Sequence, residues 1–217
     1  MSSETADAKP TDLRKVSSGS AAVIHPGWVR ITHWINVIAM FVMITSGWRI
    51  YDASPLFGFV IPPDITIGDG LGGLAGALLW HFAAMWLLVI NGIIYLTCGI
   101  VSGRFRRKLL PIRPGEVVRD LRAALTGRLS HHDLSVYNAV QRLLYAGVIA
   151  AGIVIVLSGV AIWKPVQFQE LTAAFGGYEA ARFVHFFAMA TVVCFLAVHI
   201  TLAILVPKSL RAMRIGR

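Results

Sequence analysis

FVHFFAMATVVCFLAVHI, residues 183–200, decides what kind of protein this chain is. The stretch is almost entirely apolar. With its flanks it reaches the roughly 20 residues that an α-helix needs to cross the ~30 Å hydrocarbon core of a bilayer. Two imidazole side chains, His185 and His199, interrupt it. Ionisable groups inside hydrocarbon are costly and usually serve a function, so the stretch predicts a membrane helix that carries a functional site.

Three further apolar stretches of similar length occur in the chain. Of its 217 residues, 56% are hydrophobic and only 14% are charged, which is far outside the balance of soluble proteins. The sequence therefore predicts an all-α fold, an integral membrane bundle of four transmembrane helices. We expect these helices at about 30–51, 74–101, 138–163 and 181–206. Residues 1–24 lack the apolar core of a signal peptide and are expected to form a disordered cytoplasmic tail ahead of a membrane domain at 25–217.

The distribution of Lys and Arg predicts the orientation. Four precede residue 31, eight lie in 104–128 and four lie in 208–217, whereas the opposite flanks hold only Arg49, Lys164 and Arg182. Cytoplasmic flanks are enriched in these residues, so both termini and the 104–136 loop are expected in the cytoplasm. The formal charge of +9 does not indicate nucleic acid, because no soluble domain is present to carry a basic patch. Residues 115–129 fit either an amphipathic helix on the inner leaflet or a solvated basic loop.

Four histidines lie inside the expected helices at matched depths. His185 and His199 are fourteen residues apart, which places them on one helix face with an offset of about 40° and a rise of about 21 Å. His33 lies early in a helix that starts in the cytoplasm, at the level of His199. His81 lies early in a helix that starts outside, at the level of His185. Any one of them alone is explained by a neutral imidazole bonded to a neighbouring helix, but the pattern gives two imidazoles at each of two depths.

Two facing imidazoles at one level match the axial ligands of a noncovalent b-type haem. Zinc or copper would require three or four ligands together. Cys98 and Cys194 lack the spacing of a zinc site or of covalent c-type haem. Five glycines in the helices either give room to a macrocycle or allow close helix packing: Gly47, Gly92, Gly147, Gly152 and Gly159.

The chain resembles a known family, the bacterial dihaem membrane cytochromes b grouped with cytochrome b561. It is most similar to the b-type subunit of Ni,Fe-hydrogenase and the gamma subunit of formate dehydrogenase. The similarity covers about residues 25–213 and rests on RITHWINVIAMF (30–41), YNAVQRLLY (137–145), SGVAIWKP (158–165) and the spacing of the last two helix histidines. The resemblance implies a dihaem domain at 25–217. Its inner haem iron would be bound by His33 and His199, and its outer haem iron by His81 and His185.

The resemblance also implies a quinone site beside the inner haem, at Tyr137, Asn138 and Gln141, although Val140 replaces a glycine common in relatives. The alternative is that Asn138 caps the helix while Gln141 is solvated. Two sets of arginines could pair with haem propionates or simply extend to the membrane surface: Arg30 and Arg142 inside, and Arg49 or Arg182 outside. Three histidines in flanks and loops are expected to be solvated: His25, His131 and His132.

These features predict a multi-pass electron-transfer subunit of the bacterial inner membrane. It would connect quinone at the inner haem with a periplasmic redox subunit such as a dehydrogenase, hydrogenase or molybdopterin oxidoreductase. The chemistry on the other substrate would belong to that separate subunit. The outer loops contain a few acidic residues that favour docking on that side. Alternatives are a proton-coupled transporter or channel and a passive membrane anchor, and a homo-oligomer is left open.

Overall fold

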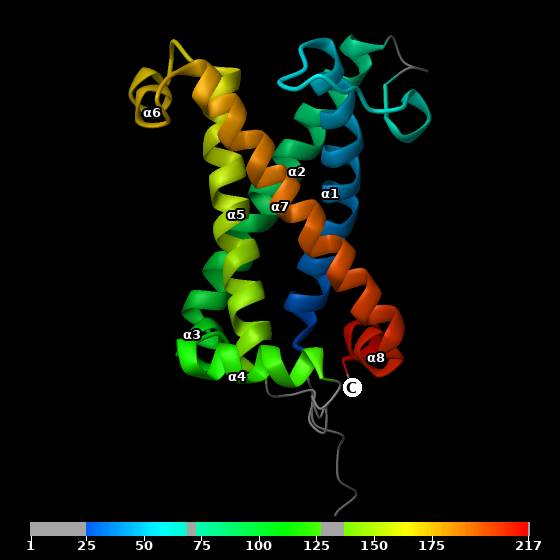
Figure 1. The fold of residues 1–217 in the computed structure, drawn as a ribbon, viewed down its shortest axis with the longest axis vertical. Coiled ribbons are helices and arrows are strands. Elements are labelled where there is room, and N and C mark those ends of the chain that lie inside the picture. Colours follow the sequence, from blue (N-terminus) through cyan, green and yellow to red (C-terminus); the bar gives the residue numbers. More distant parts are fainter. Residues whose placement is uncertain (1–24, 69–72, 127–136, 217) are drawn as a thin grey trace, which may run out of the picture.

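The computed structural model describes residues 25–68, 73–126 and 137–216, so the predicted tail at 1–24 lies outside the described residues. Four long helices dominate it: α1 (Gly27–Ala53), α2 (Leu74–Val101), α5 (Ala139–Trp163) and α7 (Tyr178–Leu205) (Figure 1). Each is long and apolar enough to cross a membrane. The described residues contain no strand. The prediction of an all-α membrane bundle is therefore confirmed.

The helix ends differ from the prediction by a few residues. Helix α5 begins at Ala139 because Asn138 is its N-cap, outside the helix. Helix α7 ends at Leu205, and Pro207 opens a further helix rather than simply stopping this one. Proline suits that place because the first helical N–H has no intrahelical partner. Shorter elements lie between the long helices or after the last one: a 3-10 turn (Pro63–Ile65), α3 (Arg104–Lys108), α6 (Gln169–Ala174) and α8 (Pro207–Ile215).

The segment for which the sequence left two alternatives is largely a helix. Helix α4 (Pro114–Leu125) lies across the end of the bundle, next to α3 (Figure 1). Its Asp120 Oδ2 accepts a hydrogen bond of 2.9 Å from the backbone N–H of Ala139, at the start of α5. A carboxylate is favourable at this place because helix N-termini carry unpaired N–H groups and a partial positive charge. Helix α4 is therefore tied to the bundle.

Close packing occurs within two hairpins, α1 with α2 and α5 with α7. The most buried residues at these contacts are small: Ala39, Ser46, Ala77, Ser158, Ala161 and Ala181. The large aliphatic and aromatic side chains lie mainly on the outer surface. This is the expected arrangement in a bilayer, where lipid is as apolar as leucine and small residues let helix backbones approach closely.

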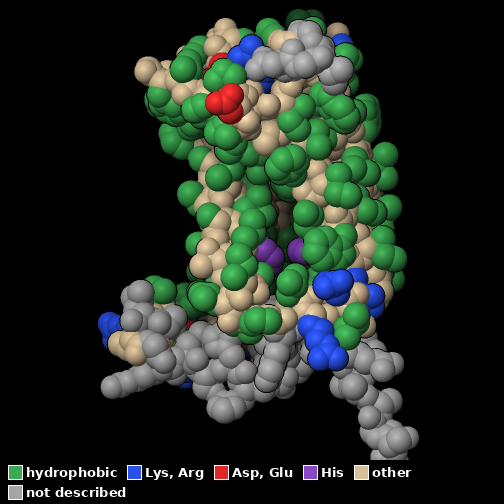
Figure 2. All heavy atoms as spheres, turned by 90° about the vertical axis from the view of Figure 1, so that its right-hand side faces the viewer, with side chains coloured by type: hydrophobic (Ala, Val, Ile, Leu, Met, Phe, Trp, Pro, Cys, Tyr) green, Lys and Arg blue, Asp and Glu red, His purple; other side chains and the backbone are tan. Residues whose placement is uncertain are grey.

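The two hairpins are joined at their ends. At one end, the ring of Phe57, in the loop after α1, packs against Phe183, Phe186 and Phe187 of α7. Arg182 of α7 also donates to the carbonyl of Ser54 at 2.5 Å. At the opposite end, Arg30 Nη2 of α1 donates to the carbonyl of Arg214 in α8 at 2.7 Å. Between these ties, Figure 2 shows a hollow between the helices with histidine side chains beside it.

Orientation can be tested with two exposed, uncharged positions at opposite ends of the bundle. Thr126, after α4, and Val166, before α6, are both exposed. In a background without Cys98 and Cys194, we expect a membrane-impermeant maleimide to label Val166→Cys in intact spheroplasts. Thr126→Cys should react only after permeabilisation, because we expect the basic end to face the cytoplasm. Labelling in the reverse pattern would invert the orientation.

Candidate functional site

His33 of α1 and His199 of α7 face each other across the hollow, although 166 positions separate them in the chain. Their ring centroids lie 6.0 Å apart, with the ring planes at 65°. A metal ion held between two imidazoles requires roughly this distance, since each metal–nitrogen bond is about 2 Å and each ring adds about 1 Å. Both rings are only partly buried. The geometry therefore fits a pair of axial ligands to one iron.

His81 of α2 and His185 of α7 form the second level. They are close enough to interact electrostatically, and both are partly buried. Each is held by a serine of its own hairpin. Ser46 Oγ lies 3.0 Å from Nδ1 of His81, and Ser158 Oγ lies 3.1 Å from Nδ1 of His185. The structure thus brings the four helix histidines together in the two combinations that the sequence predicts.

A glycine follows each of these serines and lies against the same imidazole. A Cβ added at Gly47 would lie 3.3 Å from Cε1 of His81, and one added at Gly159 would lie 3.1 Å from Cε1 of His185. Both distances are tighter than ordinary contact, so glycine lets the ring lie directly against the neighbouring helix. A Cβ at the other three glycines noted in the sequence would meet nothing within 4 Å: Gly92, Gly147 and Gly152.

The two serines were not predicted as site residues from the sequence. The signal was present as a repeated Ser-Gly dipeptide, at 46–47 and 158–159, in the first helix of each hairpin. The histidine follows 35 residues after Ser46 in one hairpin and 27 residues after Ser158 in the other. This unequal spacing hides the correspondence from a search for a fixed repeat length.

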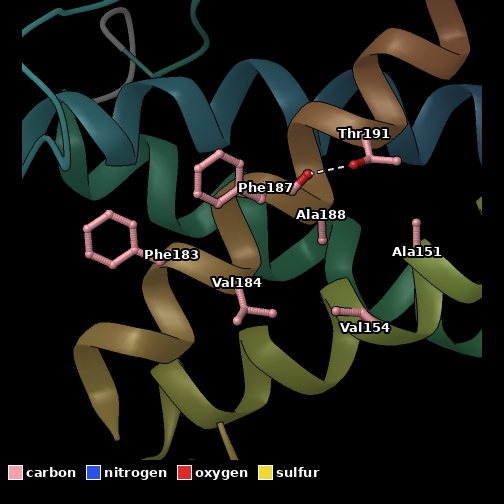
Figure 3. Close-up of a pocket in the computed structure, with 7 residues that line it drawn as sticks. All are labelled: Ala151, Val154, Phe183, Val184, Phe187, Ala188 and Thr191. Atoms are coloured by element: carbon pink, nitrogen blue, oxygen red, sulfur yellow. Dashed lines mark hydrogen bonds between the residues drawn. The ribbon is translucent and has the colours of Figure 1, made fainter. Parts of the chain in front are cut away.

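An apolar groove lies apart from the histidines, between α5 and α7 (Figure 3). Its volume is about 410 Å³, and its lining includes Ala151, Val154, Phe183 and Phe187. The hydroxyl of Thr191 is turned to its own helix, where it donates to the carbonyl of Phe187 at 2.8 Å. No titratable side chain lines the groove. Such an apolar lining is typical of a surface that contacts lipid acyl chains.

The profile of the prokaryotic cytochrome b561 family matches residues 24–216. The chain belongs to this family. Over 190 residues it is 56% identical to a candidate protein-methionine-sulfoxide reductase subunit, YedZ1, of Azospira oryzae, a match that covers 88% of this chain and 94% of the relative. Membership makes the chain a membrane electron-transfer subunit and implies b-type haem. Within the described residues, no group of three or more His, Cys, Asp or Glu side chains could hold a metal ion.

In this cytochrome b561 chain, the segment expected to meet quinone forms a capping box at the start of α5. Asn138 Oδ1 accepts from the backbone N–H of Gln141 at 2.8 Å, and Gln141 Oε1 accepts from the backbone N–H of Asn138 at 3.1 Å. The capping alternative is therefore correct for Asn138, but Gln141 completes a capping box instead of being simply solvated. Each side chain keeps an NH₂ group that the box does not use.

The arginines proposed for haem propionates already have protein partners. Arg142 donates to the carbonyls of Tyr137 and Pro111, at 3.0 and 3.2 Å. Arg182 forms an ion pair with Glu179 at 2.9 Å, in addition to its bond to α1. The buried Nε of Arg30 has no hydrogen-bond partner among the described residues. Arg30 therefore has the clearest capacity to bind a carboxylate at the inner end.

His25 is not the solvated residue that the sequence predicts. It is half-buried, and its Nδ1 lies 3.2 Å from Nη2 of Arg104, which can only donate. Burial first, and then the charge of Arg104, lower the pKa of His25 from 6.5 to about 4. Arg104 lies 79 positions further along the chain, so this contact could not be read from local sequence. His131 and His132 lie outside the described residues.

The neutral state of His25 predicts a pH dependence of stability. Between pH 6.5 and about 4, the unfolded chain binds a proton that the folded chain excludes, so stability falls as the pH falls through this window. His25→Gln should weaken that dependence, because glutamine can accept from Arg104 without titrating. Thermal unfolding in detergent, followed by circular dichroism at several pH values, measures it. Equal pH dependence in both proteins would contradict the prediction.

Proposed function

We propose that this chain binds two b-type haems and transfers electrons between quinone and a periplasmic reductase subunit in the bacterial inner membrane. The observation that carries the proposal is the 6.0 Å approach of His33 and His199 from different hairpins. Lipid-embedded imidazoles gain little from facing each other unless something binds between them. His33 and His199 would hold the inner haem, and His81 with His185 would hold the outer one.

The chain's own residues supply binding, orientation and exclusion of water. The imidazoles would hold the haem iron, and the two glycines let the imidazoles of His81 and His185 lie against the neighbouring helices. The orphaned Nε of Arg30 is suited to a propionate at the inner end. When bound, each haem supplies a one-electron couple of iron. Two ligand levels, about 21 Å apart along α7, distribute these couples between the two faces of the membrane.

Haem stoichiometry tests this assignment. The unmutated protein should contain two haem b per chain by pyridine haemochrome analysis. His185→Ala should remove mainly the outer haem and His199→Ala mainly the inner one, leaving about one haem in each variant, because a bis-imidazole site loses an axial ligand. Leu79→Ala is a matched control in the membrane, since Leu79 is exposed on α2, the helix that also carries His81. One haem or none in the unmutated protein would rule out the proposal.

Aromatic contacts support a quinone site next to the inner pair. Tyr137 contacts Tyr145 with ring centroids 5.1 Å apart, and Tyr145 contacts Phe195 at 6.3 Å. Phe195 stacks on His199 at 5.6 Å, with only 12° between the planes. A continuous row of rings thus connects the start of α5 with an inner histidine. The unused NH₂ groups of Asn138 and Gln141 are the donors that we propose for a quinone carbonyl.

A test of those NH₂ donors must leave the capping box intact. Alanine would also remove the cap, at a cost of about 1 kcal/mol. Asn138→Asp and Gln141→Glu keep the accepting oxygens of the box and remove only the NH₂ donors. We expect each variant to slow haem reduction by quinol several-fold while haem content and spectra stay unchanged. Stopped-flow spectroscopy measures the rate. Unchanged kinetics in both variants would place the quinone site elsewhere.

The relative's name indicates the kind of partner. YedZ1 is named as a candidate subunit of a protein-methionine-sulfoxide reductase, and the two chains align over nearly their whole lengths. We therefore propose a catalytic reductase subunit on the outer side, supplied with electrons from quinol. The outer end presents exposed aromatic and acidic residues such as Phe168 and Glu170. Copurification of the membrane complex identifies the subunit, and a cytoplasmic partner would contradict this side of the proposal.

A further inference from the structure

The same arrangement of serine, glycine and histidine occurs in both hairpins. Ser46 of α1 bonds His81 of α2, and Ser158 of α5 bonds His185 of α7, each through Nδ1. Both serines are 0% exposed, which places their hydroxyls inside the helix contacts. The two hairpins differ in sequence, but the contact between their helices contains the same serine–histidine hydrogen bond. Helix packing alone requires only small residues and would not require a hydroxyl at both places.

The direction of the hydrogen bond follows from the single proton of a hydroxyl. Ser46 Oγ donates to the carbonyl of Val42 at 2.5 Å, and Ser158 Oγ donates to the carbonyl of Val154 at 2.7 Å. With that proton used, each hydroxyl can only accept from the imidazole. Nδ1 therefore carries the proton, and Nε2 presents its lone pair.

The inner histidines have different surroundings. Among the residues that the structure describes, His33 and His199 hydrogen-bond no hydroxyl. Their rings instead contact Trp34 and Phe195, with centroids 5.5 and 5.6 Å apart. The serine acceptors are thus confined to the outer level. The two levels thus have the same ligand type, histidine, and differ in the residues around it.

We propose that Ser46 and Ser158 are positioning residues that set the redox potential of the outer haem. By accepting from Nδ1–H, each serine fixes the tautomer in which Nε2 binds iron and increases electron donation from that nitrogen. Stronger donation stabilises ferric over ferrous iron and lowers the potential of the outer haem. The inference rests on the proposed two-haem function and adds which residues of the chain distinguish one haem from the other.

Redox titration of Ser46→Ala, Ser158→Ala and the double variant tests the proposal. The outer haem is identified as the component that His185→Ala removes. Its midpoint potential should shift upward in each single variant and further in the double variant, while the inner component stays unchanged. The electron paramagnetic resonance signal of the outer ferric haem should change in parallel. Thr45→Val is the matched control, because Thr45 is a buried neighbour whose hydroxyl bonds only helix carbonyls.

Each outcome is decisive when haem content is measured first. Fewer than two haems in the unmutated protein would refute the proposed function itself, before any serine is changed. Two haems in the serine variants with unchanged potentials, or an equal shift in Thr45→Val, would overturn the positioning role alone. If an alanine variant loses the outer haem, Ser→Cys at that position retains the volume with a weaker acceptor. An upward shift there supports the role, and loss of haem or an unchanged potential overturns it.

Discussion

Close approach of paired helices through small residues is the constraint on which the rest of this structure depends. In lipid, no hydrophobic force draws apolar helices together, so backbones must come near enough for dispersion and hydrogen bonds to act. Alanine, glycine and serine meet this need inside the α1–α2 and α5–α7 hairpins. Because small residues occupy the contacts within each hairpin, the large side chains face outward. They therefore do not fill the space between the hairpins. That space is where the histidines meet.

Hydrogen bonds between polar groups add to the packing of the helices. Asn91 of α2, which is buried, donates to the carbonyl of Thr32 and to the side chain of Asn36, both in α1. Such bonds fix the rotation of one helix against another, since an unsatisfied amide in hydrocarbon is costly. Arg182 and the cluster around Phe57 then join the hairpins at one end, and Arg30 joins them to α8 at the other. Between these ties lies the hollow that Figure 2 shows beside the histidines.

Contacts within each hairpin and contacts between the hairpins position different histidines, an arrangement that suits electron transfer. A serine inside each hairpin hydrogen-bonds one imidazole, that of His81 or His185. His33 and His199 approach each other from different hairpins. A metal held between them would therefore connect the two halves of the protein. Family membership and the paired histidines point to the same chemistry by independent routes, one from the whole sequence and one from the distance between two rings.

The sequence by itself determined the four membrane helices, because hydropathy over some 20 residues depends on no partner. It also determined the shared face of His185 and His199, because helical periodicity fixes angles within one helix. Only the tertiary structure decided that Ser46 and Ser158 bond His81 and His185, and that His25 is half-buried beside Arg104. For Asn138 the sequence offered capping as one of two alternatives, and the structure chose it and added Gln141. These contacts join residues on different elements or use one of several donors and acceptors. They depend on how helices rotate, cross and begin, which no spacing along the chain records.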